Sequence, residues 1–191
     1  LGSHNNVTDS YVVGDNGAGI AVGGSYNLIY RSTIAAGSTG VAILGSNNTI
    51  YGSNVTGEGY DGVVVRGNRT AILDSNVYGY YYGVYIYGSD NTIRGSYVYG
   101  NWSGVYITGD DNLISGSYVT AVRHDGVDVF GSNNTIYDVN VVGGWAGVYI
   151  DGSHNLIYDV NVTGEGFGGL GIAGSYNLIR NSTIVGPGSY A

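Results

Sequence analysis

One short segment of this sequence brings together side chains that can exchange protons. The segment and the repeat after it supply five such residues: Arg123, His124, Asp125, Asp128 and Asp151. An imidazole, a guanidinium and several carboxylates are the groups that enzymes use for acid and base catalysis. We treat these five as candidate catalytic residues, with Asp128 expected to point outward from its strand. The alternative is a polar loop with no catalytic role.

A second acidic group is the candidate for a calcium site. Asp110 and Asp111 are adjacent, and Asp90 lies one repeat before Asp111. Calcium prefers carboxylate and carbonyl oxygens. The alternative is a solvated turn in which Arg69 and Asp90 form an ion pair, which would contribute little at the surface.

A recurring ring is the clearest feature outside the repeat consensus. Six consecutive repeats place a ring two residues before a recurring glycine: Tyr60, Tyr81, Trp102, His124, Trp145 and Phe167. Stacking of such rings contributes about 0.5–1.5 kcal/mol per pair. The rings are expected either to seal a corner of the core or to form a binding platform.

Further tyrosines alternate with aliphatic residues and are therefore expected to face outward: Tyr85, Tyr87, Tyr97, Tyr99 and Tyr106. An exposed aromatic patch of this size is larger than a monomer usually shows. It predicts an interface, either with another protein or with a sugar chain.

The elements that hold these residues follow from an internal repeat. The motif Gly-Ser-x-Asn-x-Ile, or a close variant, opens at Gly2, Gly24, Gly45, Gly67, Gly88, Gly109, Gly131, Gly152 and Gly174. Spacings of 21 or 22 residues predict a β-solenoid of nine coils. Within coil 88–108, alternating runs at 91–93, 96–99 and 104–107 predict three short strands. We expect one all-β domain over 1–191, about 43 Å long at about 4.8 Å per coil.

Fixed positions within the coils predict columns along the solenoid. Five and ten residues after the opening glycine stand only Val or Ile, as a buried strand face requires. Three residues after it stands Asn in every coil except the fourth, which has Thr70. Buried amides need hydrogen-bond partners, so an Asn ladder is expected along the axis. A second ladder of serines is expected, with Val139 and Val160 as replacements in two coils.

The composition narrows the function classes. Cysteine is absent, which excludes disulfides and thiolate chemistry. The net charge of −8 disfavours nucleic acid and anionic lipid as partners. No apolar run is long enough for a membrane span, and we expect no cofactor. The chain begins at Leu1, so we expect a processed product or an excerpt of a longer chain.

Asparagines in Asn-x-Ser/Thr sequences are candidates for glycosylation, provided that the protein is exported by a cell that glycosylates such sites. They are Asn6, Asn47, Asn54, Asn68, Asn101, Asn133, Asn161 and Asn181.

Repeats such as GSDNTIRGSYVYGNWSGVYIT and GSNNTIYDVNVVGGWAGVYID resemble those of right-handed parallel β-helix proteins. The resemblance is strongest to the NosD-like, carbohydrate-binding and sugar-hydrolase class of archaeal and bacterial surface proteins, and it covers the whole chain. It implies a right-handed fold and an extracellular or cell-surface location. It does not imply one activity, because this fold supports many. A copper site is not expected, because Met and Cys are absent and His4, His124 and His154 lie in different coils.

We therefore expect a structural or adhesive β-solenoid without catalysis. Neither end has a cap in the sequence, and the ninth coil ends at GPGSYA without a third strand. Open coil ends and the tyrosines would then mediate assembly of copies into a filament or coat. The alternative is a carbohydrate-binding or polysaccharide-cleaving module that uses the aromatic rings and the His124 segment. If the chain is an enzyme, it is expected to be a polysaccharide lyase or glycoside hydrolase.

Overall fold

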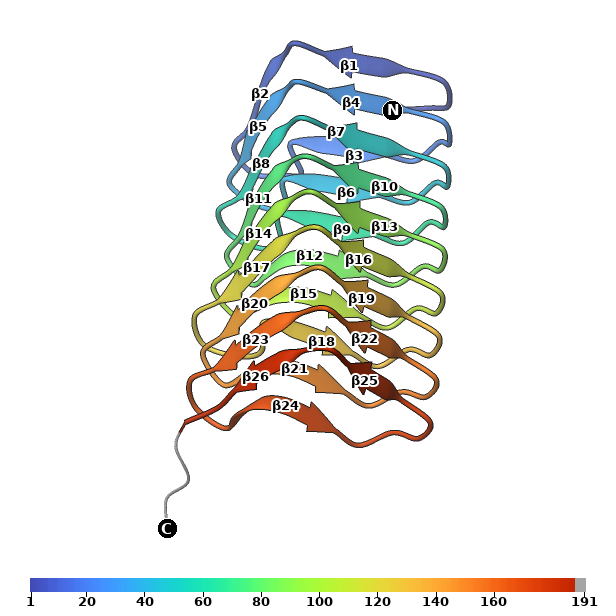
Figure 1. Ribbon diagram of the computed structural model, residues 1–191. Helices are drawn as coiled ribbons and strands as arrows, with labels where there is room; N and C mark the ends of the chain where they lie inside the picture. The colour runs from blue at the N-terminus through green and yellow to red at the C-terminus, as the bar shows by residue number, and fades with distance from the viewer. Residues whose placement is uncertain (188–191) are drawn as a thin grey trace.

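Three parallel sheets run along the molecule, and successive coils of the chain add one strand to each sheet (Figure 1). The computed structural model describes residues 1–187. Within that range the chain forms strands, turns and bends and no helix, so the predicted right-handed β-helix is confirmed. None of the described segments therefore provides a helix with the length and hydrophobicity of a bilayer span. The expected absence of a third strand in coil nine concerns residues 188–191, which lie outside the described residues.

The strands of the three sheets follow one another in coil order. The first sheet contains β1 (Asn6–Thr8), β4 (Leu28–Tyr30), β7 (Thr49–Tyr51), β10 (Ala71–Leu73), β13 (Thr92–Arg94), β16 (Leu113–Ser115), β19 (Thr135–Tyr137), β22 (Leu156–Tyr158) and β25 (Leu178–Arg180). The second contains β2 (Tyr11–Gly14), β5 (Thr33–Ala36), β8 (Asn54–Gly57), β11 (Asn76–Gly79), β14 (Tyr97–Gly100), β17 (Tyr118–Ala121), β20 (Asn140–Gly143), β23 (Asn161–Gly164) and β26 (Thr183–Val185). The third contains β3 (Ile20–Val22), β6 (Val41–Ile43), β9 (Val63–Val65), β12 (Tyr82–Ile86), β15 (Ser103–Ile107), β18 (Val127–Val129), β21 (Ala146–Ile150) and β24 (Gly168–Ile172).

Strand pairing keeps each residue beside its counterpart in the next coil. Ile72, for example, pairs with Ile50 on one side and with Ile93 on the other. The repeat period of the sequence is therefore the register of the sheets. In coil 88–108 the first two strands each begin one residue later than predicted, and the third begins one residue earlier.

The Val and Ile columns fill the interior of the solenoid. Ile50, Ile93 and Ile114 are completely buried, as are Val84 and Val105 of the third sheet. Short strands can bury this much aliphatic surface because the core is continuous from coil to coil.

The Asn ladder is confirmed, with the side-chain oxygen as the repeated acceptor. Oδ1 of Asn112 accepts the backbone N–H of Asn91 at 2.8 Å, and Oδ1 of Asn134 accepts that of Asn112 at the same distance. The column is interrupted at Thr70, whose hydroxyl is buried without a hydrogen-bond partner. From the second coil onward, each remaining amide thereby satisfies a backbone donor of the preceding coil.

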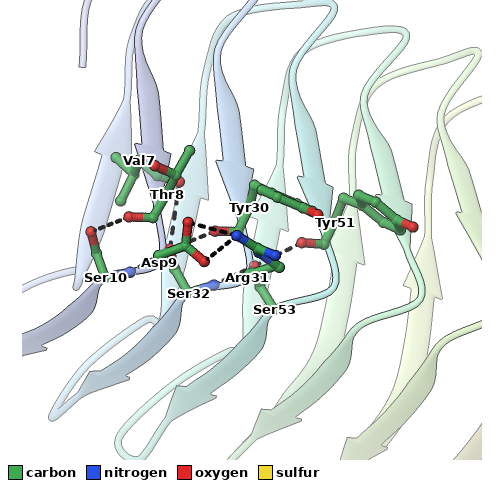
Figure 2. Close-up of polar contacts among 9 residues, drawn as sticks. All are labelled: Val7, Thr8, Asp9, Ser10, Tyr30, Arg31, Ser32, Tyr51 and Ser53. Atoms are coloured by element: carbon green, nitrogen blue, oxygen red, sulfur yellow. Dashed lines mark hydrogen bonds and ion pairs between the residues drawn. The ribbon is translucent and has the colours of Figure 1, made fainter.

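The serine ladder follows the same plan at the next bend (Figure 2). Oγ of Ser32 accepts the N–H of Ser10 at 3.2 Å and donates to the carbonyl oxygen of Tyr30 at 2.9 Å. On the outer surface beside it, Nη2 of Arg31 lies 2.8 Å from Oδ1 of Asp9. Both of these side chains are more than half exposed, so the ion pair contributes little to stability.

Candidate functional site

The outward side of the third sheet carries a cavity of about 420 Å³ that opens to solvent. Coils five to eight all contribute to its lining, which is mostly aromatic. The lining residues are Trp102, Tyr106, His124, Asp125, Asp128, Phe130, Trp145, Ala146, Tyr149 and Phe167. A largely apolar cavity with a few converging polar groups is the usual form of a ligand site.

Three of the five candidate catalytic residues meet in this cavity. Nδ1 of His124 lies 3.2 Å from Oδ2 of Asp125 and 3.9 Å from Oδ2 of Asp128. Strand β18 positions Asp128, because Val127 and Val129 point into the core and Asp128 between them points to the opposite side. Asp125 and His124 precede the strand in the loop that enters it.

Asp128 faces away from the core, as predicted, but it is not exposed to solvent. Only 1% of its surface is accessible, because Tyr106 and Tyr149 flank it in the neighbouring strands and Phe130 packs nearby. Burial raises the pKa of the Asp128 carboxyl to about 8, and the nearby Asp125 carboxylate acts in the same direction. Asp128 thus points outward but is covered by aromatic rings of the neighbouring coils.

Asp125 has a structural role as well as a place in the cavity. Its Oδ1 accepts the backbone N–H of Ala146 at 2.8 Å. Its Oδ2 is the atom that faces His124. The side chain is 2% exposed, so the loop that carries His124 is fixed by a buried hydrogen bond.

The other two candidates lie outside this group. Arg123 is exposed and makes no ion pair with either aspartate. Asp151 is exposed beyond the end of β21. Sequence proximity suggested a cluster of five, but adjacent residues at a corner of the coil point to different faces.

The six rings of the column stand at the corner before the third sheet, where some of them stack in pairs. The backbone N–H of Trp102 bonds to the carbonyl of Tyr81, and that of His124 bonds to the carbonyl of Trp102. The Trp102 and His124 rings stack at 5.2 Å, and the Trp145 and Phe167 rings stack at 5.7 Å. Trp145 is 50% exposed and Phe167 is 64% exposed, so these rings stand on the surface.

The outward tyrosines do not form the single patch that was expected. Tyr85, Tyr87 and Tyr106 lie on or beside strands β12 and β15 of the third sheet, whereas Tyr97 and Tyr99 lie on β14 of the second. The first three belong to one cluster, in which the Tyr85 and Tyr106 rings are 4.9 Å apart.

The tyrosines of the second sheet form two stacked pairs. Tyr97 stacks on Tyr118 at 5.3 Å, and Tyr78 stacks on Tyr99 at 4.8 Å. Coil geometry therefore divides a run of tyrosines that is continuous in sequence.

The calcium hypothesis for Asp90, Asp110 and Asp111 finds no support in the geometry. Among the described residues, the one group of three acidic or histidine ligands within 4.8 Å of one another is His124, Asp125 and Asp128. Oδ1 of Asp110 instead accepts the N–H of Ser132 at 2.7 Å. The alternative ion pair between Arg69 and Asp90 is also absent from the described residues, where Arg31 makes the ion pair that involves an arginine.

None of the eight candidate glycosylation residues is buried, and glycosylation remains a prediction. Asn161 is the least favourable of them, because its Nδ2 atom, to which a glycan would attach, already donates to Asn140 at 2.9 Å.

Sequence reasoning missed two features of this face. Ser103 places a buried hydroxyl, without a partner by geometry, close enough to Asp128 to lower its pKa. A second cavity, of about 400 Å³, lies over earlier coils between Tyr60, Tyr82 and Arg66. In the sequence, the cavity around Asp128 was indicated by an aspartate that stands in a column of tyrosines. The second cavity was indicated only by the ring column.

Two family descriptions match the sequence. A family described as "right handed beta helix region" matches residues 82–191, and one described as "periplasmic copper-binding protein (NosD)" matches residues 1–119. No curated protein matches the sequence significantly. His124, Asp125 and Asp128, the possible metal ligands that lie together in the described residues, do not fit copper in its soft, monovalent form. Cys and Met are absent from the chain, and this group contains one histidine.

Several solved structures share the fold at low sequence identity. The A-module of a mannuronan C-5 epimerase from Azotobacter vinelandii is 15% identical, with a TM-score of 0.69 over 96% of this chain and 57% of that module. The Dettilon tailspike protein is 15% identical, with a TM-score of 0.74 over 99% of this chain and 56% of its own. An alginate lyase from Paenibacillus sp. is 13% identical, with a TM-score of 0.61 over 95% of this chain and 100% of its own. The chain thus spans just over half the length of the first two proteins.

Proposed function

Because this chain belongs to the right-handed β-helix and NosD families, we propose that it binds a carbohydrate chain along the outward side of its third sheet. The observation that carries the proposal is the aromatic cavity of about 420 Å³ with the exposed Trp145 and Phe167 rings at its edge. Flat rings offer the apolar faces on which sugar rings can stack, and a few buried polar groups fix orientation. The epimerase and lyase that share the fold act on mannuronan and alginate by their names, which supports this class of ligand.

The ligand is proposed to be an uncharged polysaccharide. The chain has a net charge of −8, and the part of the cavity lining formed by His124, Asp125 and Asp128, which we call the cavity floor, carries two carboxyl groups. A polyanionic sugar chain would be repelled by this charge. The proposal includes a location at the cell surface or outside the cell, where such polymers occur.

Intrinsic fluorescence provides a direct test, because the chain has two tryptophans and both line the cavity. Titration with neutral and with uronate oligosaccharides should change the emission with the neutral ligands. Trp145→Ala should weaken binding at least about tenfold, since it removes a central ring. Tyr118→Ala, a stacked tyrosine of the second sheet, is the matched control and should bind as the wild type does. Equal losses in both variants, or no binding to any glycan, would contradict the proposal.

A second candidate function is cleavage of the bound glycan. Its specific support is the meeting of His124, Asp125 and Asp128, with the pKa of one carboxyl raised by burial so that it can donate a proton near neutral pH. Incubation with the glycan that binds should then release new chain ends, and Asp128→Asn should stop the release while binding persists. If the glycan binds and no new chain ends appear, the protein binds carbohydrate without cleaving it.

We also propose self-association into filaments, the structural role expected from the sequence. Support comes from the second sheet, where the stacked rings of Tyr97 and Tyr118 are 44% and 40% exposed. Contact with a second copy would cover these rings. Electron microscopy at micromolar concentration should show fibres whose subunit repeat is about 43 Å. Isolated short rods would exclude assembly by this chain alone.

A further inference from the structure

The cavity floor holds polar atoms that no hydrogen bond satisfies. Nδ1 of His124 and Oδ2 of Asp128 are buried and have no partner by geometry, although they are 3.9 Å apart. Oδ2 of Asp125 lies 3.2 Å from Nδ1 of His124, and one possible ligand atom from each of the three residues lies within 4.8 Å of the other two. A buried polar atom without a hydrogen-bond partner is costly, and this group of three side chains contains two such atoms.

We propose that His124, Asp125 and Asp128 bind a divalent first-row transition ion of the Zn²⁺ type, with an open coordination position toward the aromatic cavity. Imidazole nitrogen and carboxylate oxygen are both ligands that such an ion accepts, and three protein ligands leave a fourth position open. Two ligands about 2.1 Å from a tetrahedral ion lie about 3.4 Å from each other. The distances of 3.2 and 3.9 Å from Nδ1 to the two oxygens bracket this value.

The ligand set disfavours the other common ions. Calcium takes six to eight oxygen ligands, whereas this floor offers an imidazole nitrogen at its centre. Monovalent copper prefers sulfur, and the chain contains neither Cys nor Met. A borderline ion with three protein ligands and one free position fits the floor best.

Coil three shows that the fold does not require these ligands. There, Asp61 takes the place of Asp125, and its Oδ1 accepts the N–H of Tyr82 at 3.1 Å. Tyr60 stands where coil six has His124, and Val64 stands where it has Asp128. The scaffold is therefore complete with the aspartate alone, and the imidazole and the second carboxylate are additions specific to coil six.

The same comparison supplies variants that keep the fold. His124→Phe places in the ring column a residue that already occupies it as Phe167. Asp128→Asn keeps the shape of the side chain and removes its charge. Asp61→Asn is the matched control, since it changes the half-buried aspartate that stands at the equivalent position of coil three, outside the proposed site.

Metal binding should be measured on the whole chain, expressed without a histidine tag and stripped with EDTA. Equilibrium dialysis against Zn²⁺ with elemental analysis should give one ion per wild-type chain, and Zn²⁺ should raise the melting temperature. His124→Phe and Asp128→Asn should each weaken binding at least about 100-fold and lose the thermal shift. Asp61→Asn should retain both.

Each other outcome overturns the proposal. If the wild-type chain binds no Zn²⁺, then His124 and the two aspartates share protons with one another and do not hold an ion. Undiminished binding by His124→Phe and Asp128→Asn would place the ion elsewhere, for example at His4 or His154. A preference for Ca²⁺ over Zn²⁺ would contradict the ion class. These measurements need no glycan, so their failure is distinct from failure of the carbohydrate-binding proposal.

Discussion

Asp125 repeats in coil six the hydrogen bond that Asp61 makes in coil three. In each case Oδ1 accepts a backbone N–H from the following coil, at 3.1 Å for Asp61 and at 2.8 Å for Asp125. Both aspartates hold the corner that enters the third sheet. Only in coil six does the second carboxylate oxygen face an imidazole.

Removing either carboxylate should therefore weaken the fold by a similar amount. Asp61→Ala and Asp125→Ala each leave a backbone N–H of the next coil without its acceptor, at an expected cost of about 1–3 kcal/mol. Urea unfolding followed by circular dichroism would measure the loss. A large effect for Asp125→Ala with none for Asp61→Ala would show that the shared hydrogen bond is not what holds the corner.

The interrupted Asn ladder predicts a stabilising substitution. Thr70 stands in the column with a buried hydroxyl that has no partner. Thr70→Asn would place an amide oxygen where the other coils use one to accept the N–H of the preceding coil, with an expected gain of about 1 kcal/mol. The urea midpoint should rise. Asn112→Ala, which creates a gap in the same column, should lower it, and a fall with both variants would mean that coil four has no room for the amide.

Close packing at the start of the third strand predicts a large loss from a single methyl group. A Cβ atom added at Gly104 would lie 2.5 Å from Cγ1 of Val119 and 2.6 Å from the carbonyl oxygen of Gly126. Gly104→Ala should therefore cost about 3 kcal/mol. Gly17, where a Cβ atom meets nothing within 4 Å, provides the control. Gly17→Ala should change the unfolding free energy by less than about 0.5 kcal/mol, and equal effects would contradict the packing argument.

Alkaline pH should destabilise the tyrosine cluster of the third sheet. The pKa of Tyr82 is raised to about 12, chiefly by burial, with the charges of Tyr106 and Asp128 acting in the same direction. The unfolded chain titrates near pH 10, so it binds fewer protons than the folded chain between pH 10 and pH 12. The stabilisation is complete below about pH 10 and is lost as the pH rises through about 12.

Tyr82→Phe removes this ionisation and tests its sign. The variant should lose less stability than the wild type between pH 10 and pH 12, by on the order of 1 kcal/mol, since partial exposure weakens the effect. Denaturant midpoints across this range would measure the difference. Parallel pH curves for both proteins would show that the Tyr82 hydroxyl is as well solvated in the folded as in the unfolded state.

The sequence predicts the fold well because every residue of a coil pairs with a residue 21 or 22 positions away. Columns such as Ile50, Ile72 and Ile93 are therefore visible as a periodic pattern. Strand ends were less certain, since Gly and Ser occur on both sides of each corner. In coil 88–108 the predicted limits are displaced by one residue.

The site was harder to predict because sequence spacing does not show which way a corner residue points. His124, Asp125 and Asp128 converge, whereas Arg123 and Asp151, equally close in the sequence, do not. The burial of Asp128 depends on rings from neighbouring coils, such as Tyr106 and Tyr149. The division of the tyrosines between two sheets has the same origin, because a turn in the coil separates β14 from β15.

The pairing of every coil with its neighbours has a consequence for how such a gene can change. Deleting or duplicating a stretch that encodes one whole coil leaves all the remaining pairings intact, so the length of the rod can vary without rewriting its sequence. The cavity is not transferable in the same way. Its walls come from Trp102, Trp145 and Phe167 in three different coils, so recombination that moves coil six alone would carry the acids and the imidazole but leave the cleft behind.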